Sequence, residues 1–415
     1  MNHINHLLIF EPDVTGHQPL YIRLLYSYLL ENKSMLKVTF VIHPDINQRL
    51  IKEDSIELRD VENKINIVFL NETEILASLH NTLWIRAMNR WKLMKKYLKM
   101  TGANHGHFLY LDHIQFPLAL RLPFLPGKKI SGLLFQPPML DFYKDEKNAK
   151  EVIRDYRKKW FYAAMLNNPA LSFAYTINSL FPSYASKHFA NGNKVYHLPD
   201  PSMFPTSDIH LNDEDCALTK HVRKNRKLFL LFGALTKRKG IFEVIEALKH
   251  LEPKYISQIA IVFAGKLGAE IRAKFLDKVA SYKQNNSNAN LHIEDRFLST
   301  NEIICLLQHC DIILAPYSRY FVGSSGVLLW AVGAKKPVIA PNYGLLGYQV
   351  QKYHLGISID ATKPKVIADA FRRYLNNPDY YERNTSGMEQ LHAESLPENF
   401  ARIFFSKFIT KLDRF

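Results

Sequence analysis

Short apolar runs alternate with longer amphipathic stretches throughout the first half of the chain. Apolar runs of four to eight residues are typical of parallel strands that are buried on both faces of a sheet. Between the first two runs, residues 21–30 have the spacing of an amphipathic helix. The pattern predicts strands at 7–10, 37–42, 65–70, 108–111, 130–135, 170–177 and 195–198.

The second half repeats this rhythm after a segment rich in proline and small polar residues. Strands are predicted at 227–232, 259–264, 291–293, 312–315 and 338–340, and helices at 241–250, 269–282, 301–309 and 327–333. Such β/α alternation predicts an α/β fold with doubly wound parallel sheets.

The proline-rich segment, residues 199–222, predicts a boundary between two domains. We therefore expect an N-terminal domain over residues 1–205 and a C-terminal domain over 206–395. The last stretch, 396–415, carries phenylalanines at helical spacing. It is expected to form a helix that packs back towards the N-terminal domain.

Composition and charge narrow the class of protein. The 415 residues are 47% hydrophobic and 22% charged, which is close to the average of globular proteins. No run approaches the roughly 18–20 apolar residues of a membrane span, and the first residues do not resemble a signal peptide, so a cytoplasmic location is expected. The three cysteines are too few for a disulfide framework and are expected to be buried thiols.

The formal net charge of +15 favours an anionic partner. Phosphates, nucleic acid and an acidic membrane surface all meet that description. The sequence contains no recognised nucleic-acid-binding motif, so we do not expect nucleic acid as a partner.

A glycine- and serine-rich loop, Gly323-Ser324-Ser325-Gly326, follows a predicted strand and opens a predicted helix. A helix N-terminus offers free N–H groups and the positive end of the helix dipole. The glycines let a phosphate approach the backbone, and Ser324 or Ser325 can cap the helix or bind the anion. The loop predicts a diphosphate site, with an ordinary capped helix as the alternative.

A second loop, residues 232–240, also joins a predicted strand to a helix and carries Arg238 and Lys239. Cations there could neutralise the charge that develops on a departing nucleoside diphosphate, although such clusters are more often solvated surface. Both loops are expected at the carboxyl edge of one sheet, which is where open α/β sheets bind ligands.

These motifs together resemble glycosyltransferase family 4, also called glycosyl transferases group 1. The resemblance implies a GT-B architecture, in which two Rossmann-like domains face a central cleft. The motifs occur in the family's order over the segments 232–241, 264–266, 311–317, 323–326, 334–340 and 343–347.

The resemblance implies a role for each motif. Arg238, Lys239 and the loop Gly323, Ser324, Ser325 and Gly326 would bind the diphosphate of a nucleotide-sugar donor. The other donor-side residues would be Gly233, Lys266, Arg296, Tyr343 and Gly344. For Arg296, a salt bridge with Glu294 or Asp295 is an equal alternative.

The sequence departs from the family pattern at three positions. Ala234 stands where the family commonly has an arginine, which Lys237 or Arg238 could replace. The family commonly has two glutamates, separated by seven residues, that contact the donor sugar and the ribose. Val322 and Trp330 stand at those positions here. The identity of the donor therefore stays open.

Two loops of the first half are candidates for the acceptor side. Gly16 permits a tight turn, and His17 could contact phosphate or acceptor, move a proton, or make only a local hydrogen bond. The family resemblance implies that His113 reaches the transferred sugar and that Gln136 shapes the acceptor wall. Asp112 would point to the opposite side from His113 if their strand continued.

The resemblance also bears on mechanism. In a retaining reaction the leaving phosphate can take the acceptor proton, so no protein base is needed. An inverting reaction would need His17, Asp112 or His113 as the base. No metal ion or other cofactor is expected in either case.

Residues 84–99 form a predicted basic amphipathic helix with six cations and no acid. Its apolar positions include Trp84, Met88, Trp91 and Leu98. Such a helix can lie on an anionic bilayer, or its apolar side can pack on the protein's own sheet.

The sequence thus favours a retaining, metal-independent glycosyltransferase of polysaccharide or glycoconjugate synthesis at the cell surface. The enzyme would move a sugar from a nucleotide-sugar donor to a glycan or a lipid-linked acceptor, and could be peripheral to the inner face of the membrane. A non-catalytic binding or scaffold protein with the GT-B fold and a nucleotide-sugar epimerase are the alternatives.

Overall fold

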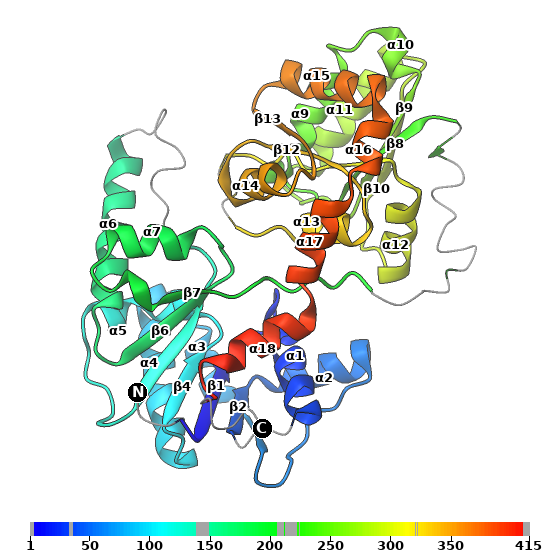
Figure 1. Ribbon diagram of the computed structural model, residues 1–415. Coiled ribbons are helices and arrows are strands. Elements are labelled where there is room, and N and C mark those ends of the chain that lie inside the picture. The colour runs from blue at the N-terminus through cyan, green and yellow to red at the C-terminus, as the bar shows by residue number, and fades with distance from the viewer. Residues whose placement is uncertain are drawn as a thin grey trace. The chain divides into compact units, whose positions relative to one another are not determined.

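The computed structural model divides the chain into two compact units (Figure 1). It describes residues 4–32, 36–137, 149–205, 211, 222–223, 225–319, 321 and 323–409. Unit 1 comprises Met1–Asp200 and Pro397–Phe415, and unit 2 comprises Pro201–Leu396. The chain thus leaves unit 1 after Asp200 and returns to it after Leu396.

Unit 1 is built on a seven-stranded parallel sheet with the strand order β3-β2-β1-β4-β5-β6-β7. The strands are β1 (His6–Glu11), β2 (Lys37–Ile42), β3 (Ile65–Phe69), β4 (His105–Phe108), β5 (Lys129–Leu134), β6 (Leu171–Thr176) and β7 (Val195–His197). The helices are α1 (Gln18–Glu31), α2 (Pro44–Asp54), α3 (Glu72–Ser78), α4 (Leu83–Thr101), α5 (Gln115–Ala119), α6 (Ala149–Leu166), α7 (Phe181–His188) and α18 (Pro397–Ser406), with the 3-10 turns η1 (Leu111–Ile114) and η3 (Gly192–Lys194).

Helices cover both faces of this sheet, so its central strands are apolar on both sides. In β1, Leu7 and Ile9 belong to one core cluster while Leu8 and Phe10 belong to the cluster on the other face. Alternate side chains of a strand point to opposite faces, which explains the unbroken apolar run in the sequence.

The fourth strand is displaced from its predicted position. The apolar run 108–111 suggested a strand, but β4 is His105–Phe108 and Leu111 begins η1. The polar appearance of His105 and His107 concealed the strand. Both rings are buried and contact the hydroxyl of Ser131 at 2.8 Å, so their polar atoms are partly satisfied inside the core.

Helix α18 packs in unit 1 beside α1, where its red ribbon lies next to the blue one (Figure 1). The rings of Phe400 and Tyr21 pack at a tilt with their centroids 4.7 Å apart, and the rings of Phe404 and His107 meet edge to face at 4.7 Å. The hydroxyl of Tyr175 donates to the backbone carbonyl of Phe404 at 2.9 Å. The aromatic positions of the last helix thus complete a core that the first two hundred residues leave open.

Unit 2 is built on a six-stranded parallel sheet with the strand order β10-β9-β8-β11-β12-β13. The strands are β8 (Lys227–Phe232), β9 (Ile259–Ala264), β10 (Asn290–Glu294), β11 (Ile312–Leu314), β12 (Val338–Pro341) and β13 (Gly356–Ile359). The helices are α9 (Ile241–Leu248), α10 (Pro253–Ile256), α11 (Arg272–Asn285), α12 (Thr300–His309), α13 (Gly326–Gly333), α14 (Gly344–Lys352), α15 (Pro364–Asn376), α16 (Pro378–Arg383) and α17 (Ser386–Glu394), preceded by the 3-10 turn η4 (Lys237–Lys239).

Both units therefore have the predicted doubly wound α/β architecture. In β8, Phe229 and Leu231 face one apolar cluster and Leu228 and Leu230 face the other. The sequence did not predict β13, because this edge strand is short and alternates buried with half-buried residues.

The cysteines only partly match the expectation of free thiols. Cys310 is a buried free thiol, and burial raises its pKa to about 12. Cys305 is disulfide-bonded, so the expectation is wrong for this residue. Cys216 lies outside the described residues.

Candidate functional site

The predicted donor loops meet at the point where the unit 2 sheet reverses direction. The chain runs outward from β8 through β9 to β10, then returns to β11 beside β8 and continues the other way. The loop after β8 and the loop after β11 therefore stand next to each other at the carboxyl edge. In open α/β sheets this switch point is the usual ligand-binding position.

Lys239 lies at the centre of this edge and is 5% exposed. Its ammonium Nζ donates a 2.6 Å hydrogen bond to the backbone carbonyl of Phe232, the last residue of β8. A Cβ added to Gly233 would lie 2.8 Å from this Nζ, so a side chain there would displace the ammonium. Gly233 has φ +93°, which also favours glycine.

Tyr317 connects the parts of the site, and the sequence did not single out this residue. Its ring lies under the ammonium of Lys239, with Nζ 5.3 Å from the ring centroid. Its hydroxyl accepts a hydrogen bond from Ser325, and its backbone carbonyl accepts one from the hydroxyl of Tyr343 at 2.7 Å. An aromatic residue three positions after the end of β11 was the available sequence signal.

Ser325 is the N-cap of α13, and its hydroxyl accepts from the backbone N–H of Leu328. Of the two serines predicted as possible caps, Ser325 is therefore the one that caps the helix. Ser324 is half-buried, and a Cβ at either Gly323 or Gly326 would meet nothing within 4 Å. The two glycines therefore face open space at the N-terminus of the helix.

The remaining donor-side residues differ in how they are engaged. The exposed Arg238 lies over the ring of Phe321 at 5.3 Å. Lys266 is half exposed and lies 3.5 Å from the carboxylate of Asp295. Gly344, with φ +69°, is the first residue of α14.

Arg296 forms ion pairs with Glu294 and with Glu302, at N–O distances of 2.6 and 2.5 Å. The salt-bridge alternative is therefore the one that the structure contains, with Glu302 in place of Asp295. The guanidinium of Arg296 is thus paired with carboxylates of β10 and α12.

Of the two positions where glutamates were absent, Val322 lies outside the described residues. Trp330 lies on α13 and packs edge-on against Phe204 at 5.9 Å within unit 2. An apolar contact thus replaces the second carboxylate.

Unit 1 has an equivalent switch point between β1 and β4. Gly16, with φ +77°, forms the turn after β1, and the exposed His17 precedes α1 and stacks on Tyr21 at 6.0 Å. Gln136 follows β5 and is exposed, and its backbone carbonyl accepts from the hydroxyl of Tyr162.

Asp112 and His113 lie on η1 rather than on a continuing strand. The Asp112 carboxylate is held by the backbone N–H of Phe135 at 2.8 Å and by the hydroxyl of Tyr162 at 2.8 Å. Burial raises the pKa of Asp112, and these hydrogen bonds lower it only in part. Asp112 thus fastens the end of β5 to α6.

His113 contacts a buried ion pair that the sequence did not reveal. Arg90 of α4 is 1% exposed, and its guanidinium donates hydrogen bonds to both carboxylate oxygens of Asp13, at 2.8 and 2.9 Å. The Nδ1 atom of His113 lies 2.8 Å from the same guanidinium. Glu11 is fully buried beside Asp13, and burial raises its pKa well above the usual value.

Helix α4 confirms the predicted element, Leu83–Thr101, but uses its apolar positions differently along its length. Trp91 and Leu98 are buried in the unit 1 core. Trp84, at the start of the helix, is 43% exposed. The packing alternative therefore holds for the middle and end of 84–99.

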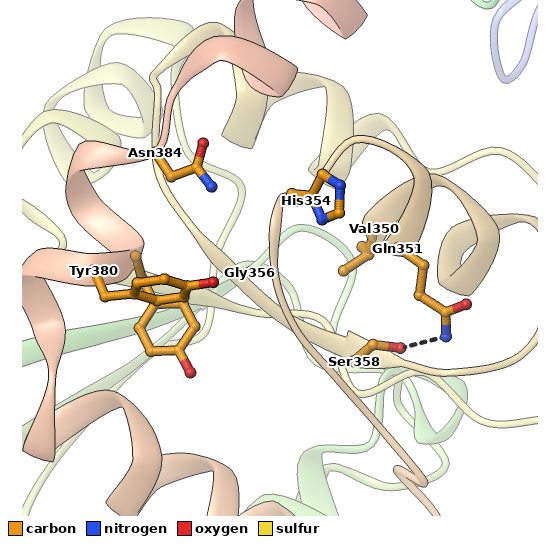
Figure 2. Close-up of a pocket in the computed structure, with 8 residues that line it drawn as sticks. Val350, Gln351, His354, Gly356, Ser358, Tyr380 and Asn384 are labelled. Carbon is orange, nitrogen blue, oxygen red and sulfur yellow. Dashed lines mark hydrogen bonds between the residues drawn. The ribbon is translucent and has the colours of Figure 1, made fainter.

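A separate hollow of about 240 Å³ lies beside the edge strand β13 (Figure 2). Its lining comes from α14, β13 and α16, and includes His354, the exposed Tyr380 and Asn384. No candidate residue from the sequence lines it. It is distinct from the switch point between β8 and β11.

Within the described residues, neither a metal-binding cluster nor a membrane-spanning helix is present. No cluster of three or more histidine, cysteine, aspartate and glutamate side chains there is arranged to bind a metal ion. None of the helices in those ranges combines the length and apolar character needed to cross a membrane.

Residues 218–388 match the family model described as Glycosyl transferases group 1. Similar solved structures include sucrose-phosphate synthase from Thermosynechococcus elongatus, at 14% identity and a TM-score of 0.69, covering 97% of this chain and 98% of that one. WaaG, a glycosyltransferase of lipopolysaccharide biosynthesis, matches at 14% identity and a TM-score of 0.60, over 97% and 99% of the two chains.

Anabaena HepE in complex with UDP matches at 11% identity and a TM-score of 0.65, over 97% of this chain and 99% of that one. No curated protein matches the sequence. At such identities the solved structures show only the fold. The segment that matches the family model covers most of unit 2. The segment 218–388 is therefore similar to the glycosyl transferases group 1 family, and the chain has the GT-B fold.

Proposed function

We propose that this protein transfers a sugar from a nucleotide-sugar donor to an acceptor hydroxyl, with the donor diphosphate held at the switch point of unit 2. The observation that carries the proposal is the buried ammonium of Lys239 beside the open glycine loop of α13. Burying a charged ammonium costs free energy unless a negative charge lies nearby. The hydrogen bond of Lys239 goes to the neutral carbonyl of Phe232.

A diphosphate would complete this arrangement. The free N–H groups at the start of α13 and the helix dipole favour an anion in front of Gly323 and Gly326. Lys239 and the exposed Arg238 would neutralise the negative charge that grows on the leaving diphosphate. Ser325 would hold the helix terminus in place as its cap.

The proposed reaction breaks the bond between the anomeric carbon and the phosphate oxygen and forms a bond from that carbon to the acceptor oxygen. The acceptor oxygen attacks on the same face from which the phosphate leaves, which gives retention. Its proton passes to the leaving phosphate oxygen, so no protein base is needed. The fixed role of Asp112 in holding Phe135 and Tyr162 supports this route, since it removes one candidate base.

We further propose that the acceptor is a glycan or is lipid-linked, and that unit 1 docks on an anionic membrane surface. The docking patch consists of exposed apolar side chains on two helices: Leu83, Trp84 and Ile85 of α4, and Ile153, Tyr156 and Trp160 of α6. Edge-to-face ring contacts from Trp84 through Phe116 and Phe161 to Trp160 join the two groups.

Charge around this docking patch fits an anionic lipid surface. The exposed α6 residues Arg154, Arg157 and Lys158 lie next to the apolar ones in sequence. Tryptophan and tyrosine side chains favour the interface of a bilayer, and each nearby cation adds roughly 1 kcal/mol of attraction to anionic lipid. The patch therefore involves the start of α4 together with α6, instead of the whole of 84–99.

The test is release of nucleoside diphosphate from a panel of nucleotide sugars in the presence of cell-envelope extract. UDP-sugars come first, because HepE was solved in complex with UDP and with UDP and glucose. Transfer predicts acceptor-dependent release from at least one donor. Tight nucleotide binding without release would instead support the binding-protein alternative, which the packing of Trp330 against Phe204 favours. Interconversion of the donor sugar without release would support an epimerase.

A further inference from the structure

The hollow beside β13 lies at the opposite edge of the unit 2 sheet from the donor loops. Gly356 is the first residue of β13 and His354 comes two residues before it, so both line the hollow at the amino end of the strand. The glycine loop of α13 and the turn that contains Lys239 follow the carboxyl ends of β11 and β8. In a parallel sheet the amino and carboxyl ends of the strands lie at opposite edges. The hollow is therefore separate from the donor site, and its lining residues all belong to unit 2.

The walls of the hollow combine a tyrosine ring with amide and hydroxyl groups. Figure 2 shows Tyr380 and Asn384 on one side of it and His354, Gln351 and Ser358 on the other. Among the described residues that line it there is no lysine, arginine, aspartate or glutamate. Its volume of about 240 Å³ is below the roughly 300–1,000 Å³ of pockets for drug-sized ligands. The hollow thus favours a small, uncharged ligand of about one ring.

Several side chains of the hollow have hydrogen-bonding groups to offer a ligand. Gln351 Nε2 donates to Ser358 Oγ at 3.1 Å, which leaves the amide oxygen of Gln351 available. Within the described part of the chain, the side chains of His354, Tyr380 and Asn384 make no hydrogen bond. An amide supplies both donors and an acceptor, and sugar hydroxyls both donate and accept.

The open edge of β13 adds backbone groups to the same hollow. The carbonyl of Leu355 accepts from the backbone N–H of Val338, on the β12 side. Backbone groups alternate in direction along a strand, so those of Gly356 and Ser358 point away from β12. In the described sheet β13 is the last strand, so no strand pairs with that edge.

The tyrosine ring is exposed but anchored at its base. Tyr380 is 62% exposed and meets the ring of Tyr381 edge to face at 5.0 Å. Tyr381 in turn packs at 6.1 Å on Tyr374, which is fully buried in the unit 2 core. Tyrosine thus presents a rigid apolar surface, against which the C–H face of a sugar ring can pack.

The backbone at His354 also points to a role for its side chain. His354 has φ +52°, in the left-handed region. Glycine adopts this conformation without strain, whereas a residue with a Cβ does so at a cost in free energy. A strained residue in a ligand-sized hollow is typical of functional positions.

We propose that this hollow binds one neutral sugar residue, packed on Tyr380 and hydrogen-bonded by Asn384, Gln351 and His354. This binding site goes beyond the proposed transfer reaction and does not depend on it. A glycan held here would be attached to unit 2 at the sheet edge opposite the donor loops.

The test is saturation-transfer NMR of the full-length protein with the methyl glycosides of glucose, galactose, mannose and N-acetylglucosamine. We expect saturation transfer to at least one of them. Methyl glucuronide, which adds a carboxylate to the glucose ring, should bind more weakly than methyl glucoside. Absence of transfer to all four neutral glycosides, or tighter binding of the glucuronide, would overturn the proposal.

Substitutions locate the bound sugar. We expect Tyr380→Ala and His354→Gly each to weaken binding by at least about fivefold. His354→Gly relieves backbone strain, so its thermal midpoint should not fall and lost binding cannot be ascribed to unfolding. Lys335→Gly is the matched control, because Lys335 also has a positive φ, +54°, but does not line the hollow. Lys335→Gly should bind as the wild type does.

A last variant separates this site from the donor site. Gly323→Ala changes the donor loop and should leave sugar binding in the hollow unchanged. Binding that is lost in Gly323→Ala but kept in Tyr380→Ala and His354→Gly would place the sugar at the donor loops and refute the proposal. A protein that binds the sugar in the hollow but releases no nucleoside diphosphate would contradict only the proposed function.

Discussion

The Nζ atom of Lys239 lies 2.6 Å from the carbonyl oxygen of Phe232, in a buried hydrogen bond between the loop after β8 and the strand end itself. One ammonium is thus tied to the backbone at the position where we place the donor diphosphate. A substitution there affects both stability and binding, and the two effects must be measured separately.

Replacing Lys239 with alanine leaves the Phe232 carbonyl without its partner, which costs on the order of 1–3 kcal/mol in the free energy of unfolding. It also removes a cation from the diphosphate, so we expect nucleoside diphosphate affinity to fall by about tenfold or more. Denaturant unfolding and calorimetric titration measure the two quantities. Lys237→Ala changes an exposed cation of the same turn and should alter neither. Wild-type affinity in a destabilised Lys239→Ala protein would limit Lys239 to a structural role.

The glycine loop allows a sharper separation. At Gly323 and Gly326 an added methyl group meets no atom, so alanine at either position should change stability by less than about 0.5 kcal/mol. If a phosphate lies against this backbone, the same methyl groups should weaken nucleoside diphosphate binding by about tenfold.

Gly240→Ala serves as a control in which the added methyl group should lower stability. Its Cβ would lie 2.1 Å from the carbonyl oxygen of Pro316, at φ +73°. We expect a loss of stability of about 1–3 kcal/mol. Unchanged affinity in both Gly323→Ala and Gly326→Ala would move the diphosphate away from this loop.

The sequence predicted these loops well because strand ends and glycines are local features. The carboxyl edge of a parallel sheet brings Gly233 and Gly323 together whatever the details of packing. The sequence could not predict the Asp13–Arg90 pair, because the two residues are 77 positions apart in the chain. In the sequence, Arg90 is one of six cations on a basic helix. The fold shows that Arg90 is buried, whereas the other five cations are exposed or half-buried.

The same limit explains the misplaced fourth strand. Periodicity treats histidine as polar, yet His105 and His107 are core residues whose ring atoms contact Ser131. Buried polar groups are predictable from sequence only when their partners are known, and Ser131 belongs to a different strand.

The two buried histidines predict acid sensitivity of unit 1. Burial lowers the pKa of His105 to about 3 and that of His107 well below the ordinary value. The unfolded chain then binds more protons than the folded one, so stability falls as pH drops below about 6.5, by up to roughly 1.4 kcal/mol per pH unit for each histidine.

Substitutions that keep the contacts with Ser131 isolate this effect. His105→Gln places an amide near Nε2 and His107→Asn places one near Nδ1, the atoms that contact the hydroxyl. The double variant should lose a large part of the decline between pH 6.5 and 4 in denaturant unfolding, with His6, whose pKa burial lowers to about 4, causing part of what remains. Substitution of the exposed His80 by glutamine should keep the whole decline. An unchanged slope in the double variant would show that other groups cause the decline.

The docking patch predicts binding to vesicles that contain anionic lipid, with affinity that falls as salt increases. Trp84→Ser and Trp160→Ser should each weaken binding several-fold, because each removes an exposed ring from the bilayer interface. Tyr380→Ser, which changes an equally exposed ring in unit 2, should have no effect. Vesicle flotation measures this. Binding that ignores lipid charge and salt would contradict the proposal.

The return of the chain to unit 1 through α18 affects how the protein is made. The ribosome completes unit 2 before it releases the phenylalanines that pack on Tyr21 and His107. Unit 1 must therefore wait, with part of its apolar surface uncovered, while a whole second unit is synthesised. Unit 2 is contiguous in the chain and can fold as soon as it emerges, so a segment made after unit 2 completes a unit that was begun before it.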